Sequence, residues 1–230
     1  MSSRITTLNS TRSTVNLVRS SHSWTEAESA AGFVLRYLSP MRKQLTSIMG
    51  SESEADQALR ILLTHLVSAG FGEHRKGRLR DFLSRAVRSC AKARLSENGR
   101  LESESHRLAT ATPDSKEWLM MWRDCVLERA WRALERMEHQ DKERPVYSVL
   151  WTSTVNAKAS LDELAVAVEK KCGVKLDQIK VQQLKSEGKA SFAQLLADEV
   201  VETLATPDKA SVKKEIQSLG IGGVFSGLSV

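Results

Sequence analysis

The 230-residue chain contains only three cysteines, Cys90, Cys125 and Cys172, and no C-x-x-C pair. An odd number of widely spaced cysteines excludes a disulfide framework and an evident zinc site, and it is typical of a reducing compartment. The five histidines are scattered, and none lies at ligand spacing from another. We therefore expect no metal or other cofactor, and a cytoplasmic location.

Long apolar runs and catalytic motifs are missing as well. No segment approaches the roughly 18 apolar residues that a membrane-spanning helix needs, so we expect no membrane partner. The sequence has no Gly-rich phosphate loop, no G-x-S-x-G motif and no paired histidines. An enzyme is therefore the weakest class of function for this chain, and we expect a non-enzymatic protein.

Acidic residues are absent from the start of the chain until Glu26, and the opening is rich in Ser, Thr and Arg. This composition superficially resembles an organellar transit peptide. The stretch from Thr14 to Arg19 also fits a modest amphipathic helix. We interpret residues 1–23 as a partly ordered N-terminal arm with a short helix.

The overall composition is that of a soluble globular protein, with 41% hydrophobic and 27% charged residues. A chain of 230 residues is long enough for one or two domains that each bury a core. The formal net charge of +6 mildly favours a polyanionic partner.

Residues 24–95 are predicted to form a compact helical domain, because apolar residues recur at helical spacing between breaks at Pro40, Gly50 and Gly70. Ser51 or Ser53 is expected to cap the helix that follows Gly50. The last helix of this block is strongly basic, which fits either a solvated face or a nucleic-acid footprint. The candidate contacts are Arg75, Lys76, Arg78, Arg80, Arg85 and Arg88.

Residues 96–115 lose the apolar periodicity and are rich in Ser, Glu, Thr and Ala, which predicts a polar linker. A second helical domain is expected over residues 116–205, starting with a long helix that ends near His139. We expect one apolar stripe of this helix to be core, namely Trp118, Leu119, Trp122, Val126, Ala130 and Met137. The alternative is that its three tryptophans, with Trp131 as the third, stack on bases. Residues 206–230 are predicted to form a final helix, ending at Gly220, and a loose tail.

Residues 160–201 read as a short helix, a tight corner and a longer helix. Ser160 and Glu163 form an S-x-x-E capping box, Gly173 can adopt positive φ, and Asp177 is a candidate cap for the second helix. Such a unit is either a helix-turn-helix that reads duplex DNA or an ordinary helical hairpin with a solvated polar face. The outward candidates for DNA contact are Lys180, Gln182, Gln183, Lys185 and Lys189.

The order of these parts resembles a bacterial RNA polymerase sigma factor. The stretch Lys76 to Leu83, with Ala86, Val87 and Arg88, follows the family pattern G-R-x-R-x-W/F-L-x-x-V-x-R at the end of region 2. Upstream, Trp24, Phe33, Tyr37, Leu38 and Pro40 are similar to its W…F…Y-x-P segment. Downstream, residues 118–134, 145–150 and 160–201 are similar to its region 4 half. The chain thus looks like a divergent member of the sigma-70 family, of the extracytoplasmic-function type found in planctomycetes.

This resemblance implies an all-α fold with two small helical domains and no covalent chemistry. It implies promoter DNA and RNA polymerase core as partners, with an anti-sigma protein as a further candidate. Region 2 would hold the separated strand at the −10 element, and the helix-turn-helix would bind the −35 element. The residues that the resemblance places against polymerase are Asp56, Gln57 and Arg60.

Several family positions are altered here: Gln57, Arg60 and Ile61 stand where acidic and glutamine residues are usual, and Gln182 and Lys189 are among those that replace recognition-helix arginines. The alternative function is therefore a sigma-like helical adaptor or sequestering protein that does not open promoters. It would bind other proteins through the apolar faces around Trp118, Trp122 and Trp131.

Overall fold

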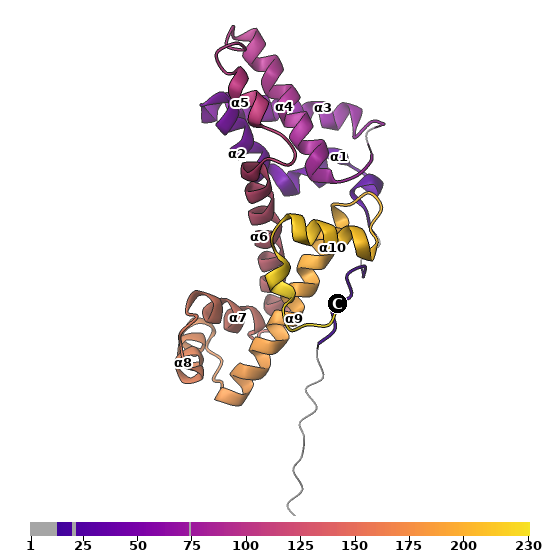
Figure 1. The fold of residues 1–230 in the computed structure, drawn as a ribbon. Coiled ribbons are helices and arrows are strands. Elements are labelled where there is room, and N and C mark those ends of the chain that lie inside the picture. Colours follow the sequence, from indigo (N-terminus) through magenta and orange to yellow (C-terminus); the bar gives the residue numbers. More distant parts are fainter. Residues whose placement is uncertain (1–12, 20–21, 74) are drawn as a thin grey trace, which may run out of the picture. The chain divides into compact units, whose positions relative to one another are not determined.

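The computed structural model describes residues 13–19, 22–73 and 75–230. Within these ranges the regular structure is helical, and two isolated β-bridges join Thr14 to Ser229 and Arg78 to Leu204 (Figure 1). The predicted all-α fold is confirmed. In chain order the helices are α1 (Ala30–Val34), α2 (Leu38–Met49), α3 (Glu52–Ala69), α4 (Leu79–Glu97), α5 (Ser105–Thr110), α6 (Lys116–Gln140), α7 (Val146–Val155), α8 (Leu161–Cys172), α9 (Gln178–Glu202) and α10 (Lys209–Ser218).

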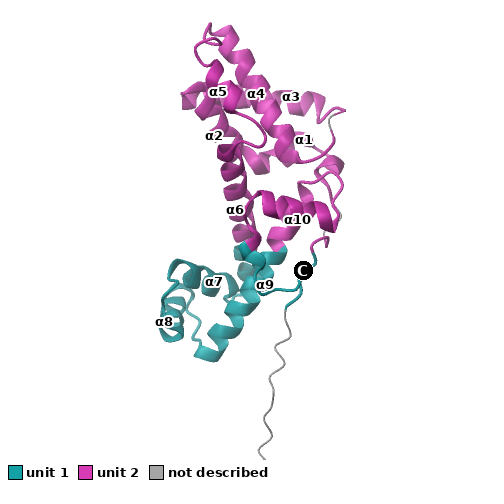
Figure 2. Cartoon of the chain, viewed as in Figure 1, with its two compact units in different colours: residues 1–16, 134–194, 223–230 teal, residues 17–133, 195–222 magenta. Residues whose placement is uncertain are grey.

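The chain divides into two compact units, coloured separately in Figure 2. Unit 1 comprises residues 1–16, 134–194 and 223–230, and unit 2 comprises residues 17–133 and 195–222. These divisions differ from the predicted domains, which meet at a linker over residues 96–115. That segment contains α5, which packs against α2 and α4 and buries Leu108.

In unit 2, helix ends follow the local chemistry of the sequence. Pro40 lies in the first turn of α2, where its missing N–H is not needed. Gly50 ends α2 in the left-handed region at φ 72°, and the Ser51 side chain accepts a hydrogen bond from the Glu54 N–H to cap α3. Helices α2, α3 and α4 pack against one another, and their buried faces include Met41, Leu45, Leu62, Leu66, Leu83 and Val87.

In unit 1, α7, α8 and the first half of α9 enclose a small core of Val149, Leu164, Val168, Val181 and Leu184. Helix α9 approaches α7 at Gly188, which is buried. A Cβ atom at that position would lie 3.1 Å from the Leu150 Cβ and 3.2 Å from the Val146 carbonyl oxygen. Glycine therefore sets the spacing of these two helices.

Both ends of the chain differ from the sequence-based expectation. The predicted short helix over residues 14–19 is wrong, because the described part of the arm is non-helical and Val15 N donates to Ser229 O at 2.7 Å. Residues 1–12 of the predicted arm lie outside the described residues. The tail expected to be loose contains a 3-10 turn, Gly222–Phe225, with Phe225 buried.

Replacing Gly188 by Val should destabilise the protein by about 1–3 kcal/mol, because its γ-methyl groups would meet Val146 and Leu150. Helix propensity alone favours Val over Gly, so a loss of stability would report the clash. Urea unfolding followed by circular dichroism measures the change. The matched control is Ala190→Val on the half-buried side of the same helix, for which we expect less than about 0.5 kcal/mol. Equal stability of the two variants would contradict the close approach at Gly188.

Candidate nucleic-acid interface

The first candidate surface lies on unit 1, where α8 and α9 are joined by a short corner. Ser160 Oγ accepts from Glu163 N at 3.3 Å, and the Glu163 carboxylate accepts from Ser160 N at 2.7 Å, which confirms the predicted capping box. Gly173 ends α8 with φ 76°. The carboxylate of Asp177 accepts from Lys180 N at 2.7 Å and so caps α9, as predicted.

A side-chain contact ties the starts of the two helices together. Gln178 Nε2 donates to both carboxylate oxygens of Asp162, at 2.8 and 2.9 Å. Together with the shared core, this contact limits the freedom of α9 relative to α8. The pair is therefore a defined corner rather than two helices on a loose loop.

The polar side of the first half of α9 faces solvent. Lys180, Gln182, Gln183 and Lys189 are exposed, as expected, whereas Lys185 is half-buried at the edge of the core. Ile179 adds an apolar side chain to this face and is 71% exposed. Within the described residues, none of the three lysines forms an ion pair. This set of residues is called the α9 face below.

The second candidate surface is the exposed side of α4 in unit 2. Arg85, Arg88 and Lys92 recur at helical spacing, are exposed, and form no ion pair with any described residue. This set is called the α4 basic row. In the preceding loop Lys76 is exposed, and Arg75 is exposed while its Nη1 donates to Thr25 O at 3.0 Å.

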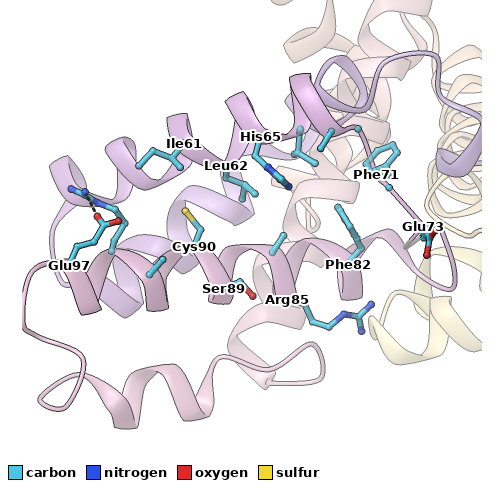
Figure 3. A pocket seen from close by; sticks show the side chains of 17 residues that line it. Ile61, Leu62, His65, Phe71, Glu73, Phe82, Arg85, Ser89, Cys90 and Glu97 are labelled. Carbon is cyan, nitrogen blue, oxygen red and sulfur yellow. Dashed lines mark hydrogen bonds and ion pairs between the residues drawn. The ribbon is translucent and has the colours of Figure 1, made fainter.

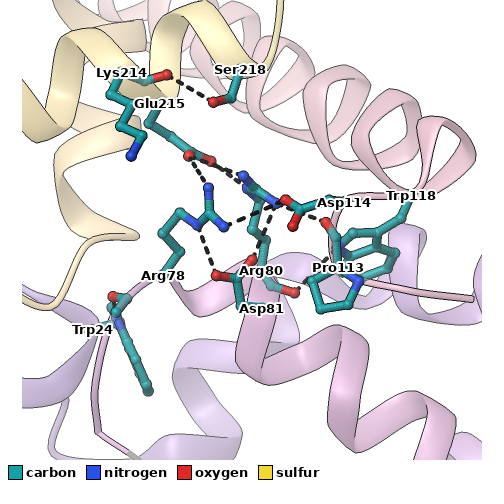
Figure 4. Close-up of polar contacts among 11 residues, drawn as sticks. Trp24, Arg78, Arg80, Asp81, Pro113, Asp114, Trp118, Lys214, Glu215 and Ser218 are labelled. Carbon is teal, nitrogen blue, oxygen red and sulfur yellow. Dashed lines mark hydrogen bonds and ion pairs between the residues drawn. The ribbon is translucent and has the colours of Figure 1, made fainter.

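Arg80, which we predicted to contact nucleic acid, is instead an interior residue with 1% of its surface exposed. Its Nε donates to Glu215 Oε1 at 2.6 Å and its Nη2 to Glu215 Oε2 at 3.3 Å (Figure 4). The remaining nitrogen, Nη1, donates to Pro113 O at 2.8 Å and to Asp81 Oδ1 at 3.1 Å. In this arrangement Arg80 presents no donor to an external phosphate.

Arg78 belongs to the same cluster and is also engaged. Its Nε donates to Asp81 Oδ2 at 2.8 Å, and its Nη1 lies 3.5 Å from Glu215 Oε2. Partial burial lowers the pKa of Arg78, but the carboxylates of Asp81, Glu215 and Asp114 outweigh that effect and leave the pKa above its usual value. The arginines at the start of α4 are thus paired within unit 2, unlike those of the α4 basic row.

The residues expected to contact polymerase lie on α3, and two of the three are engaged within the chain. Asp56 accepts two hydrogen bonds from Arg42, at 2.6 and 3.1 Å, which hold the pKa of its carboxyl below the usual value. Gln57 Oε1 accepts from Arg94 Nη2 at 3.1 Å. Arg60 is exposed and forms no ion pair within the described residues.

An apolar groove runs between α3 and α4 in unit 2 (Figure 3). Its volume is about 780 Å³, and Ile61, His65 and Arg85 are among the side chains along it. Because Arg85 also belongs to the α4 basic row, the groove and the cationic face adjoin. The apolar lining residues include Ile61, Leu62, Leu66, Ala69, Phe71, Phe82, Ala86 and Ala93.

The tryptophans of α6 are core residues where they lie in unit 2. Trp118 and Trp122 are fully buried, and Trp118 Nε1 donates to Arg80 O at 3.1 Å. The Trp122 ring stacks on Tyr37, with ring centroids 4.9 Å apart and planes 15° from parallel. Neither indole is therefore available to stack on bases or to bind a partner. Met137, which we placed on the same buried stripe, is 47% exposed.

Sequence reasoning missed a buried carboxylate in unit 2, Glu199 on α9. It accepts from Tyr37 Oη at 2.6 Å, from Arg129 Nε at 2.5 Å and from Arg36 Nη2 at 3.4 Å. Burial, followed by the charge of Glu199, raises the pKa of Tyr37 well above its usual range. The available signal was the position of Glu199 beside Leu196 and Val200 on the buried side of α9.

No family model, curated protein or solved structure matches this chain. Among the described residues, no three His, Cys, Asp or Glu side chains are grouped so that they could hold a metal ion. The helices of the described ranges include none with the length and hydrophobicity to cross a membrane.

The Tyr37 hydroxyl should ionise only when the protein unfolds. A pKa raised in the folded state means that the phenol stabilises the protein below about pH 10 and that this contribution is lost as pH rises from there towards the folded pKa. The chain has two tyrosines, and burial raises the pKa of Tyr147 as well, so alkaline titration of phenolate absorbance should show two delayed phases, of which Tyr37→Phe removes the later one. Tyr147→Phe, which alters the half-buried tyrosine, is the control and should keep that phase. If Tyr37→Phe kept the later phase, the buried contact between Tyr37 and Glu199 would be contradicted.

Proposed function

We propose that the protein is a DNA-binding factor of transcription initiation, of the sigma type that its sequence resembles. Unit 1 would bind duplex DNA with the first half of α9 in the major groove. Unit 2 would hold a separated strand along the α4 basic row. RNA polymerase core is the proposed protein partner.

The observation that carries this proposal is the α9 face, because it presents both kinds of contact that duplex DNA requires. Lys180 and Lys189 can neutralise phosphates, which supplies affinity without sequence information. Between them, Gln182 and Gln183 are exposed and their amides form no hydrogen bond with any described residue, so they can pair with adenine edges. Ile179 offers an apolar contact for a thymine methyl group.

Support in unit 2 comes from the arrangement of charge beside the groove. Arg85, Arg88 and Lys92 can follow the phosphates of one strand, and the half-buried Phe82 lies in the adjoining groove. Single-stranded nucleic acid is commonly held by such a combination of cations and an aromatic surface. Arg78 and Arg80 are left out of this strand contact because their guanidinium groups are occupied.

Removing the two flanking lysines should weaken duplex binding without changing sequence preference. For Lys180→Ala combined with Lys189→Ala, the slope of log K against log salt should become shallower by about 2, because two phosphate contacts are lost. Fluorescence anisotropy with random and AT-rich duplexes over a salt series measures both affinity and slope.

The comparison variant for that experiment is Gln183→Ala, which keeps the charge. It should leave the salt slope unchanged and reduce discrimination between duplex sequences, by about 1–3 kcal/mol where the glutamine pairs with a base. Absence of duplex binding by the unaltered chain at low salt would refute the proposed function.

A second candidate function is the helical adaptor, and the groove between α3 and α4 favours it. An apolar groove beside Ile61, itself 49% exposed, suits a protein partner whether or not DNA is also bound. The face around Trp118 and Trp122 does not serve this role, since both are fully buried. An adaptor would bind its partner in a salt-tolerant way and leave duplex DNA unbound.

Docking in this groove can be tested with polymerase core. If the groove contributes to binding, Ile61→Asp should reduce retention of core by about tenfold at high salt, because the apolar contact would be lost. Val67→Asp is the matched control, since Val67 lies on the same helix, is 73% exposed and does not line the groove. Equal losses in both variants would argue against this surface.

A further inference from the structure

The start of α4 is covered by the C-terminal part of unit 2. The backbone of Gly77 and Leu79 pairs with that of Thr203 and Ala205, through Leu79 N to Thr203 O and Ala205 N to Gly77 O, both at 2.8 Å. These bonds flank the isolated bridge between Arg78 and Leu204. The segment that follows α9 in the sequence therefore lies directly on the start of α4.

Helix α10 completes this cover with a side chain. Glu215 is 2% exposed and lies among the buried residues Val212, Ile216 and Leu219 of the same segment. It meets Arg80 side-on, with one carboxylate oxygen on Nε and the other on Nη2 (Figure 4). This paired geometry is the one in which a guanidinium group also binds a phosphate.

Of the carboxylates around Arg78 and Arg80, one is supplied by the C-terminal segment. Arg78 and Arg80 face three carboxylates, those of Asp81, Asp114 and Glu215. Asp81 lies on α4 itself, and Asp114 sits just before α6, whereas Glu215 comes from the cover. If Glu215 left and a phosphate took its place, the two arginines would again face three anions.

We infer that residues 203–219 form an autoinhibitory cover, in which Glu215 occupies the position that a phosphate of a nucleic-acid strand takes when the cover opens. This inference rests on the proposed function, because it adds Arg78 and Arg80 to the strand surface of the α4 basic row. Only molecules with an open cover would bind a strand through these arginines. The apparent affinity is therefore the affinity of the open state multiplied by the fraction of molecules that are open.

Several features of the cover suit it to opening as a unit. Helix α10 has only ten residues, Lys209–Ser218, and its outward side chains Lys213, Lys214 and Gln217 are exposed. Short segments with few buried side chains are the ones that open locally while the rest of a domain stays folded.

The test uses the full chain and a labelled oligothymidylate. Glu215→Gln removes the carboxylate and should raise strand affinity by about tenfold, with a steeper salt dependence because additional phosphates are bound. Glu117→Gln, an exposed residue on α6, makes the same change in net charge and should leave affinity near that of the unaltered chain. Compared with the unaltered chain and with Glu117→Gln, the Glu215→Gln variant should show faster hydrogen exchange in α10. The amides of α6 around Val126 should stay protected.

Ile216→Asp provides an independent way to open the cover. It places a charge on the buried side of α10 while making the net charge more negative, so a gain in affinity could not come from overall charge. We expect it to raise strand affinity as Glu215→Gln does. If α10 is released in either variant and affinity stays within twofold of the control, the cover is overturned. Duplex binding by the unaltered chain, measured in parallel, separates this outcome from failure of the proposed function, in which neither duplex nor strand is bound.

Discussion

The buried ion pair between Arg80 and Glu215 is the constraint that places the C-terminal segment of unit 2 on α4. The two residues are 135 positions apart, and both are almost fully shielded from water. A charge in such a place is tolerated only when it is paired and hydrogen-bonded, and breaking a buried pair by removing one partner typically costs about 3–5 kcal/mol. The position of the C-terminal segment on α4 is therefore set by charge as well as by apolar packing.

Glu199, which precedes Glu215 in the chain, is a second buried carboxylate that is paired and hydrogen-bonded. It gathers Tyr37, Arg36 and Arg129 from the first part of unit 2. Together, Glu199 and Glu215 neutralise the arginines that lie inside the unit. The α4 basic row and the α9 face keep cations that form no ion pair with any described residue, so the modest net charge of +6 understates how cationic these two surfaces are.

Local features were predictable from the sequence, and long-range pairings were not. The Ser160–Glu163 box, the turn at Gly173 and the break at Gly50 depend on neighbouring residues, so each could be inferred. The pairing of Arg80 with Glu215 depends on tertiary structure. A signal was nevertheless present, because Arg80 falls in the apolar stripe of Leu83 and Val87, and Glu215 in that of Val212 and Ile216. A charge of each sign on a buried stripe should be interpreted as half of an interior pair before it is assigned to a ligand. The sigma-type activity stays a proposal, since it rests on the exposed side chains.

The division of the chain has a consequence for its synthesis. Residues 134–194 interrupt unit 2 in sequence, so the ribosome completes them before it supplies residues 195–222. At typical elongation rates, Arg80 waits roughly 7 to 27 seconds after translation before Glu215 is made. During that interval the Arg80 guanidinium lacks its buried partner, and the hydrophobic surface of unit 2 is unfinished. Unit 2 therefore reaches its native state only after residues 195–222 have been made, and its unfinished surface is open to chaperones until then.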